Sequence, residues 1–153
     1  MPRITRMIIP DQKTVYHVIS RTVLEGYPLG DEEKDELVKI LIKFSKLYFT
    51  EVLGFCVMGD HFHLLVRSVT GELSLALQRI QNRYSRWFNR TRQRDGKLYK
   101  DRFLSSRIEL LSYRRRVVTY LHDNPVAAGQ VSHPVDAPGS SAHHYAQARR
   151  PRW

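Results

Sequence analysis

Hydrophobic positions follow two different spacings along the chain, and these alternate from one segment to the next. Residues 14–21 are rich in β-branched and aromatic side chains and predict a first strand. Glycine and proline within residues 26–30 mark a loop, after which Asp31 is a candidate N-cap for a helix that reaches about residue 49. Acidic residues come first in this helix and lysines later, which suits the helix dipole.

Two apolar runs, residues 51–58 and 61–69, are separated only by Gly59 and Asp60. So short a connection predicts an antiparallel hairpin. Because side chains alternate between the two faces of a strand, His61 and His63 are expected to project to one face at the start of the returning strand.

The next segment, residues 71–90, predicts a helix with two separate stripes. The apolar stripe steps by 4, 3, 4 and 3 residues and consists of Leu73, Leu77, Ile80, Tyr84 and Trp87. A second stripe steps by 4, 3 and 4 residues and consists of Arg79, Arg83, Arg86 and Arg90. One face of this helix should therefore pack on a core, while another carries guanidinium groups.

The remaining pattern is a polar loop at residues 91–96, a strand at residues 98–108 and a last clear helix. That helix should begin with Ser112 as its N-cap and end near His122, because Pro125 biases the preceding residue away from helical geometry. A short helix is expected near residues 143–148.

The order strand, helix, hairpin, helix, strand, helix predicts an α+β fold with an antiparallel sheet, helices packed on one face and the other face available for a site. This order resembles the ferredoxin-like fold. We expect a single domain over residues 1–153, with its core at about 12–131 and a C-terminal extension at 132–153.

The distribution of positive charge along the chain indicates a binding partner. The formal net charge is +10, and residues 79–116 hold 13 Lys or Arg against 3 acidic residues, so the whole excess lies in that quarter of the chain. Such confinement indicates a polyanion, most often nucleic acid, rather than general solubility.

Cys56 is the only cysteine, so no internal disulfide forms, and its apolar neighbours indicate a core residue. Without a signal peptide or an apolar run of about 18 residues, the protein should be soluble and cytoplasmic.

Candidate chemistry lies in two places. Two imidazoles on one strand face can share a divalent metal ion with ligands from elsewhere, although a His-x-His pair on a strand is often inert. Tyr120 and Asn124 are four residues apart, or one helical turn. A phenol can act as a covalent nucleophile only with help from a metal or a base, and the apolar stripe that Tyr120 shares also allows a packing role.

A resemblance connects these residues. His61-Phe62-His63 is an HUH motif, in which a bulky hydrophobic residue separates two histidines. Further matching segments are Tyr16-His17-Val18, Met58 to Leu65, Asn82 to Asn89, Asp101-Arg102-Phe103 and Tyr120 to Gly129. In order and spacing the chain resembles the single-tyrosine HUH transposases, especially the branch associated with repetitive extragenic palindromes (REP).

The resemblance implies a ferredoxin-like or RRM-like enzyme that cleaves and rejoins single-stranded DNA bearing a hairpin or palindrome. By resemblance, Tyr120 is the nucleophile and forms a 5′-phosphotyrosine. His61 and His63 hold a divalent cation, Mg²⁺ or Mn²⁺, and Asn124 supplies the third ligand. The family includes dimers, so a homodimer is one expected assembly. Gly59 departs from the proline common at this place in the family, which predicts a looser hairpin, and Ala127-Ala128 stands where a basic residue is common.

The basic residues are expected to contact DNA phosphates, which positions a strand without reading its sequence. They are Arg79, Arg83, Arg86, Arg90, Arg92, Arg94, Lys97, Arg102, Arg114 and Arg115.

Two other functions fit the same residues. A non-catalytic domain would bind structured single-stranded nucleic acid without forming a covalent product. A metal-dependent hydrolase would use His61 and His63 to activate water, with Tyr120 as a bystander.

Overall fold

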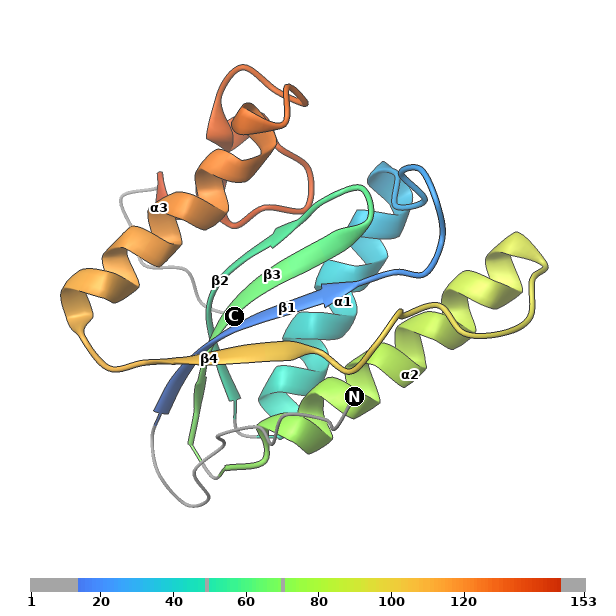
Figure 1. The fold of residues 1–153 in the computed structure, drawn as a ribbon, viewed down its shortest axis with the longest axis horizontal. Helices are drawn as coiled ribbons and strands as arrows, with labels where there is room; N and C mark the ends of the chain where they lie inside the picture. The colour runs from blue at the N-terminus through green and yellow to red at the C-terminus, as the bar shows by residue number, and fades with distance from the viewer. Residues whose placement is uncertain (1–13, 49, 70, 147–153) are drawn as a thin grey trace.

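The computed structural model describes residues 14–48, 50–69 and 71–146 (Figure 1). The elements are β1 (Thr14–Arg21), α1 (Asp31–Leu47), β2 (Thr50–Val57), β3 (His61–Ser68), α2 (Leu73–Arg92), β4 (Leu104–Ile108), α3 (Leu111–Ala127), the 3₁₀ helix η1 (Pro134–Asp136) and α4 (Ala142–Tyr145). Their order is the predicted one, while both ends of the predicted domain, 1–13 and 147–153, lie outside the described residues. No helix in the described ranges is both long and apolar enough to cross a membrane.

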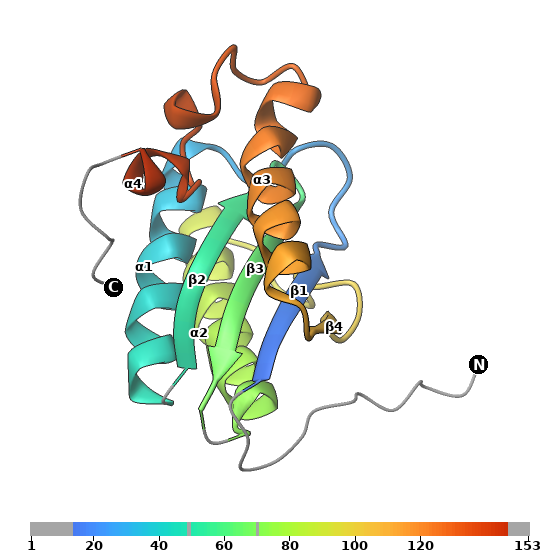
Figure 2. The same cartoon turned by 90° about the vertical axis from the view of Figure 1, so that its left-hand side faces the viewer.

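The four strands form one sheet in the order β2-β3-β1-β4, and every neighbouring pair is antiparallel. α1 and α2 cover one face of this sheet, and α3 crosses the other (Figure 2). The α+β, ferredoxin-like fold class is thereby confirmed. The face that was expected to be available for a site is the one that α3 partly covers.

The larger core lies between the sheet and the first two helices. It contains Phe62, Leu64 and Val66 of β3 and four residues of the predicted apolar stripe of α2, of which Tyr84 is fully buried. The fifth residue of the stripe, Trp87, is partly buried against this core. The Tyr84 hydroxyl donates a hydrogen bond to the Glu33 backbone oxygen at 2.9 Å and so links α2 to α1. Burial of the apolar stripe leaves the arginines of the second predicted stripe exposed: Arg79, Arg83, Arg86 and Arg90.

A smaller core holds α3 on the opposite face. Val117 and Leu121 of α3 pack on Val15, Leu65 and Ile108, which come from three different strands. Because these three strands are neighbours in the sheet, the helix lies across β3, β1 and β4. This packing fixes the helix that carries Tyr120.

The end of α3 differs from the prediction. The helix was expected to stop near His122, but it continues to Ala127 with Pro125 inside it. A proline without an N–H removes one hydrogen bond, and in the last turn the neighbouring groups remain bonded: Ala128 N donates to Asn124 O at 2.9 Å, and Gln130 N to Pro125 O at 2.9 Å. Pro125 is buried within α3, and because the helix continues to Ala127, Asn124 lies on the same helix as Tyr120.

Several boundaries also move. The strand expected at 98–108 is shortened to Leu104–Ile108, because residues 98–103 turn inward and bury Leu98, Tyr99 and Phe103 in the larger core. α2 begins two residues later than expected and extends into the predicted loop as far as Arg92. The N-caps are Gly30 and Leu110 rather than Asp31 and Ser112. The short helix expected near 143–148 is Ala142–Tyr145, and positions 147 and 148 lie outside the described residues.

Candidate active site

Two adjacent strands supply one wall of the candidate site. In the β1–β3 pair, Ile19 is opposite His63 and Arg21 is opposite His61. Residues opposite each other in an antiparallel pair project to the same face, and side chains alternate along each strand. His17 and Arg21 therefore share the face of His61 and His63, which also carries Val15 and Leu65 and is the face on which α3 packs.

Tyr120 of α3 lies over this wall. Its ring centroid is 5.6 Å from that of His63, with the planes nearly perpendicular at 89°, and 6.4 Å from that of His17. The side chain is half exposed, at 54% for the residue. The structure thus brings the predicted nucleophile to one of the predicted metal ligands from 57 residues away in the sequence, with its ring open to solvent.

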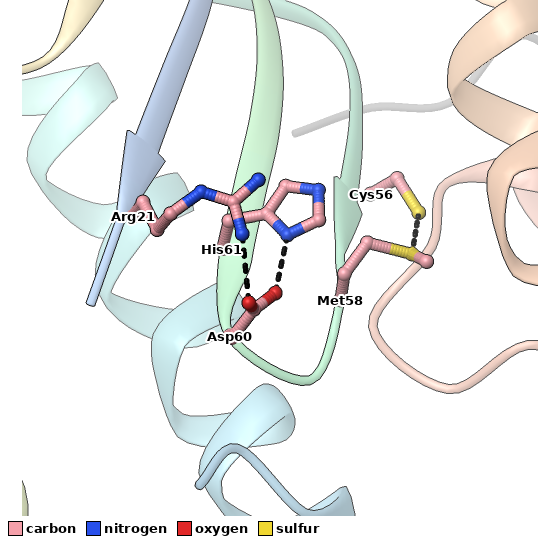
Figure 3. Close-up of polar contacts among 5 residues, drawn as sticks. All are labelled: Arg21, Cys56, Met58, Asp60 and His61. Atoms are coloured by element: carbon pink, nitrogen blue, oxygen red, sulfur yellow. Dashed lines mark hydrogen bonds and ion pairs between the residues drawn. The ribbon is translucent and has the colours of Figure 1, made fainter. Parts of the chain in front are cut away.

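His61 is held by a carboxylate from the preceding turn. Its Nδ1 donates to Asp60 Oδ1 at 2.6 Å, and Asp60 Oδ2 accepts a hydrogen bond from Arg21 Nη1 at 2.7 Å (Figure 3). This leaves His61 with its Nε2 lone pair as the available ligand atom, the usual arrangement of metal-binding histidines with a carboxylate behind them. The ring centroids of His61 and His63 are 5.0 Å apart.

Gly59, where the chain departs from the family pattern, sits in a closely packed turn. A Cβ at this position would lie 2.6 Å from Cδ1 of Tyr27. The turn is closed by Met58 N, which donates to His61 O at 2.7 Å, and Gly59 O accepts from Leu29 N at 2.8 Å. The absence of a side chain therefore lets the loop before α1 pack against the turn that presents Asp60 and His61.

His63 is buried and contacts a third histidine. Its Nδ1 lies 3.0 Å from His17 Nε2. Burial lowers the pKa of His63 to about 3, and the nearby charges of His61, His17 and Arg21 act in the same direction. Burial also lowers the pKa of His17. Both imidazoles are therefore neutral near pH 7, which is the state in which an imidazole can bind a metal.

The donors fit a divalent cation in their chemistry. Across the described ranges no three His, Cys, Asp or Glu side chains form a group that could hold a metal ion. The predicted third ligand, Asn124, is an amide and lies outside that set. Among the described residues, Asn124 Nδ2 is a buried atom without a hydrogen-bond partner.

Cys56 is a core residue, as predicted. It is fully buried beneath α3, and its thiol lies 3.6 Å from the Met58 sulfur (Figure 3). Burial raises the pKa of this thiol to about 12, so it is protonated and unreactive at neutral pH.

The predicted DNA-binding residues fall into three groups. Arg79, Arg83, Arg86 and Arg90 are exposed on α2, in the layer on the opposite side of the sheet from Tyr120. Arg92, Arg94 and Lys97 make bonds within the chain: Arg92 with Glu33, Arg94 with Asn89 Oδ1 at 2.7 Å and Lys97 with the Lys100 carbonyl. Arg102 precedes β4, and Arg114 and Arg115 lie in the first turns of α3. The structure therefore does not bring these residues together on one surface.

Sequence reasoning gave no role to His17, Arg21 or Asp60. Their contribution depends on the pairing of β1 with β3 and on the turn before His61. A ferredoxin-like order puts these two strands side by side, and alternation then puts His17 and Arg21 on one face. The register that aligns them with the histidines has no signal in either segment alone.

Comparisons with known proteins agree with this fold. The family model described as "Transposase IS200 like" matches residues 11–124. Among solved structures, the chain is similar to a REP-associated tyrosine transposase bound to a REP hairpin, with a TM-score of 0.80 and 21% identity over 99% of this chain and 89% of that one. It is also similar to a putative transposase from Deinococcus radiodurans, with a TM-score of 0.53 and 20% identity over 80% and 97% of the two chains.

At these identities the two structural likenesses establish the fold. No curated protein matches the sequence significantly. The family match covers about three quarters of the chain and includes His61, His63, Tyr120 and Asn124. It confirms the sequence-based prediction of a DNA transposase. The chain belongs to the IS200-like transposase family.

Proposed function

We propose that this transposase cleaves and rejoins hairpin-bearing single-stranded DNA through a covalent bond to Tyr120. The observation that carries the proposal is the half-exposed Tyr120 ring set nearly perpendicular to His63, 5.6 Å away. A phenol needs a polarised phosphate beside it in order to react. His63 lies beside Tyr120, and the His61 ring centroid is 5.0 Å from that of His63, so both imidazoles are available to bind a cation near the phenol.

The chemistry follows from the phenol. Tyr120 Oη loses its proton to solvent and bonds to phosphorus, while the bond from phosphorus to the 3′ oxygen breaks. The 3′ oxygen takes up a proton and leaves as a hydroxyl, and the 5′ phosphate remains on Tyr120. Because the phosphotyrosine is an ester similar to the one broken, a 3′ hydroxyl can attack it in turn. That reverse step restores the phenol and transfers the strand without a nucleotide cofactor.

His61, His63 and Asn124 would hold the cation, Mg²⁺ or Mn²⁺. Nε2 of His61 is turned away from Asp60, and Asn124 lies one helical turn after Tyr120 on α3, which supports this ligand set. A divalent cation bound there would polarise a phosphoryl oxygen and orient the phosphate toward Tyr120.

The partner is proposed to be single-stranded DNA with a hairpin or palindrome, which would place the chain in the REP-associated branch of its family. The similar REP-associated transposase is bound to a REP hairpin, and the 13 basic residues of segment 79–116 suit a polyanion. A homodimer is proposed as well, from the family resemblance alone.

The test uses end-labelled hairpin DNA incubated with Mn²⁺ and the protein, followed by a denaturing gel. We expect a covalent protein–DNA product that disappears in Tyr120→Phe. The matched control is Tyr113→Phe, because Tyr113 is also a half-exposed tyrosine of α3, and it should form the product normally. Cleavage that survives in Tyr120→Phe would favour the hydrolase, and salt-sensitive binding without cleavage in the wild type would favour the non-catalytic binder.

A further inference from the structure

We infer that His17 is a positioning residue: its Nε2 accepts the Nδ1 proton of His63, which holds His63 in the tautomer that presents an Nε2 lone pair to the site. The inference rests on the proposed function, since it gives that lone pair to the proposed cation. His17 belongs to β1, the strand paired with β3, and contacts His63 at the side of its ring. It is not one of the proposed ligands of the cation.

The contact between the two rings has the geometry of a hydrogen bond. The nitrogens are 3.0 Å apart, within the range of an N–H donor and its acceptor. The ring centroids are 5.3 Å apart and the planes differ by only 25°. Rings in nearly one plane, with their nearest nitrogens this close and their centres this far apart, meet edge to edge rather than face to face.

Only one proton can occupy that contact. A neutral imidazole donates through one nitrogen and accepts through the other. If His17 donates, His63 Nδ1 is the acceptor and its proton sits on Nε2, where it blocks a cation. If His63 donates, its Nε2 is free and the His17 proton sits on Nδ1. Cation binding at His63 Nε2 therefore requires the second arrangement.

His61 shows the same logic with a different partner. Its Nδ1 donates to Asp60, which Arg21 holds from β1. β1 thus fixes both histidines of β3: Arg21 acts on His61 through Asp60, and His17 acts on His63 directly. The two strands are paired along residues 14–21 and 61–68, so the register of the sheet sets the positions from which these two side chains act.

The first test is the tautomer of His63 in the metal-free protein, read from the ¹⁵N shifts of labelled histidine side chains. We expect a proton on Nδ1 of His63 and on Nδ1 of His17 in the wild type. A wild-type His63 protonated on Nε2 would overturn the inference, whether or not the protein forms a DNA adduct. This measurement needs no variant, so it does not depend on how His17 substitutions fold.

The second test is Mn²⁺ affinity by calorimetry in a matched pair, His17→Gln and His17→Phe. The glutamine carbonyl can accept the His63 proton, whereas phenylalanine fills the space without accepting. Partners behind a metal ligand are typically worth 10-fold to 100-fold in affinity, so we expect a loss of at least about tenfold in His17→Phe and a smaller loss in His17→Gln. His133→Ala removes an exposed histidine and should bind Mn²⁺ as the wild type does.

Equal affinities for the wild type and both His17 variants would overturn the inference while leaving the proposed function intact. A wild type that binds Mn²⁺ no better than His61→Ala would refute the metal site itself, and the inference with it. An adduct lost only in Tyr120→Phe tests the proposed function separately.

Discussion

His122 of α3 and Ser141 of the C-terminal segment are 2.8 Å apart, from Nε2 to Oγ, and their contact ties the helix of Tyr120 to the edge of the sheet. Ser141 Oγ also accepts from Phe55 N at 3.0 Å. Residues on either side continue the attachment, since Val57 N donates to Gly139 O at 2.8 Å and Cys56 pairs with Ser140. The segment after α3 therefore covers the otherwise open edge of β2, which protects it from pairing with other chains.

Ser141→Ala should destabilise the protein. It removes a buried hydroxyl that bonds to β2 and α3 at once, and leaving buried polar partners unmatched typically costs about 1–3 kcal/mol. The free energy of unfolding in urea measures this loss. Ser132→Ala, at an exposed position of the loop after α3, is the matched control and should unfold like the wild type. Equal stability of the two variants would show that the segment does not hold α3.

Because burial lowers the pKa of His63, the free energy of unfolding should decrease as the pH falls. Its folded pKa is about 3, while in the unfolded chain a histidine titrates near its ordinary value of about 6.5. Between these values the unfolded chain binds a proton that the folded protein does not, so stability falls as the pH is lowered below about 6.5. We expect a loss of about 2 kcal/mol between pH 6.5 and 5 in metal-free buffer.

The measurement is urea unfolding at several pH values for the wild type and His63→Gln, with His133→Gln as the exposed control. His63→Gln should show a shallower pH dependence than the wild type, and His133→Gln should follow the wild type. Parallel curves for the wild type and His63→Gln would mean that His63 is readily protonated in the folded state.

Local patterns sufficed for most of the fold. The two stripes of α2 can be recognised in the sequence because helical spacing depends only on nearby residues. The apolar stripe predicted the burial of Tyr84, and the basic stripe predicted the exposed arginines. The same local reasoning failed at Pro125. A rule about backbone geometry takes no account of burial: Leu121 and Pro125 are both buried residues of α3, and the helix continues past His122 to Ala127.

The candidate site was only partly visible in the sequence. His61, His63 and Tyr120 belong to a recognisable motif, and the structure brings Tyr120 to His63. The support from His17 is a contact across 46 residues, set by strand register. Neither strand carries a residue that dictates this register, so the support could be identified only once β1 and β3 were paired.

Cys56 should resist alkylation in the folded protein. Its thiol is buried and its pKa is raised to about 12, so at pH 8 almost no thiolate is present or accessible. Mass spectrometry after iodoacetamide treatment should find unmodified protein in native buffer and one adduct in urea. Stability should also fall as the pH rises above about 9, because only the unfolded chain then loses the thiol proton. Rapid modification in native buffer would indicate that α3 readily leaves the sheet.

The arginines on the two sides of the sheet should contribute unequally to DNA binding. Arg115 lies in the first turns of α3, the helix of Tyr120, whereas Arg83 lies on α2 in the opposite layer, and both are exposed. A strand whose phosphate reaches Tyr120 runs along the α3 side, so we expect Arg115→Ala to weaken the binding of single-stranded DNA and Arg83→Ala to leave it nearly unchanged.

Fluorescence anisotropy across a series of NaCl concentrations tests this, because each phosphate contact contributes about 0.7 to the slope of log affinity against log salt for single strands. Arg115→Ala should lower that slope by about this amount, and Arg83→Ala should keep the wild-type slope. Equal reductions in both variants would mean that the DNA wraps around the sheet to α2. The basic stripe predicted from the sequence would then be a second binding surface, joined to the site around the edge formed by β4.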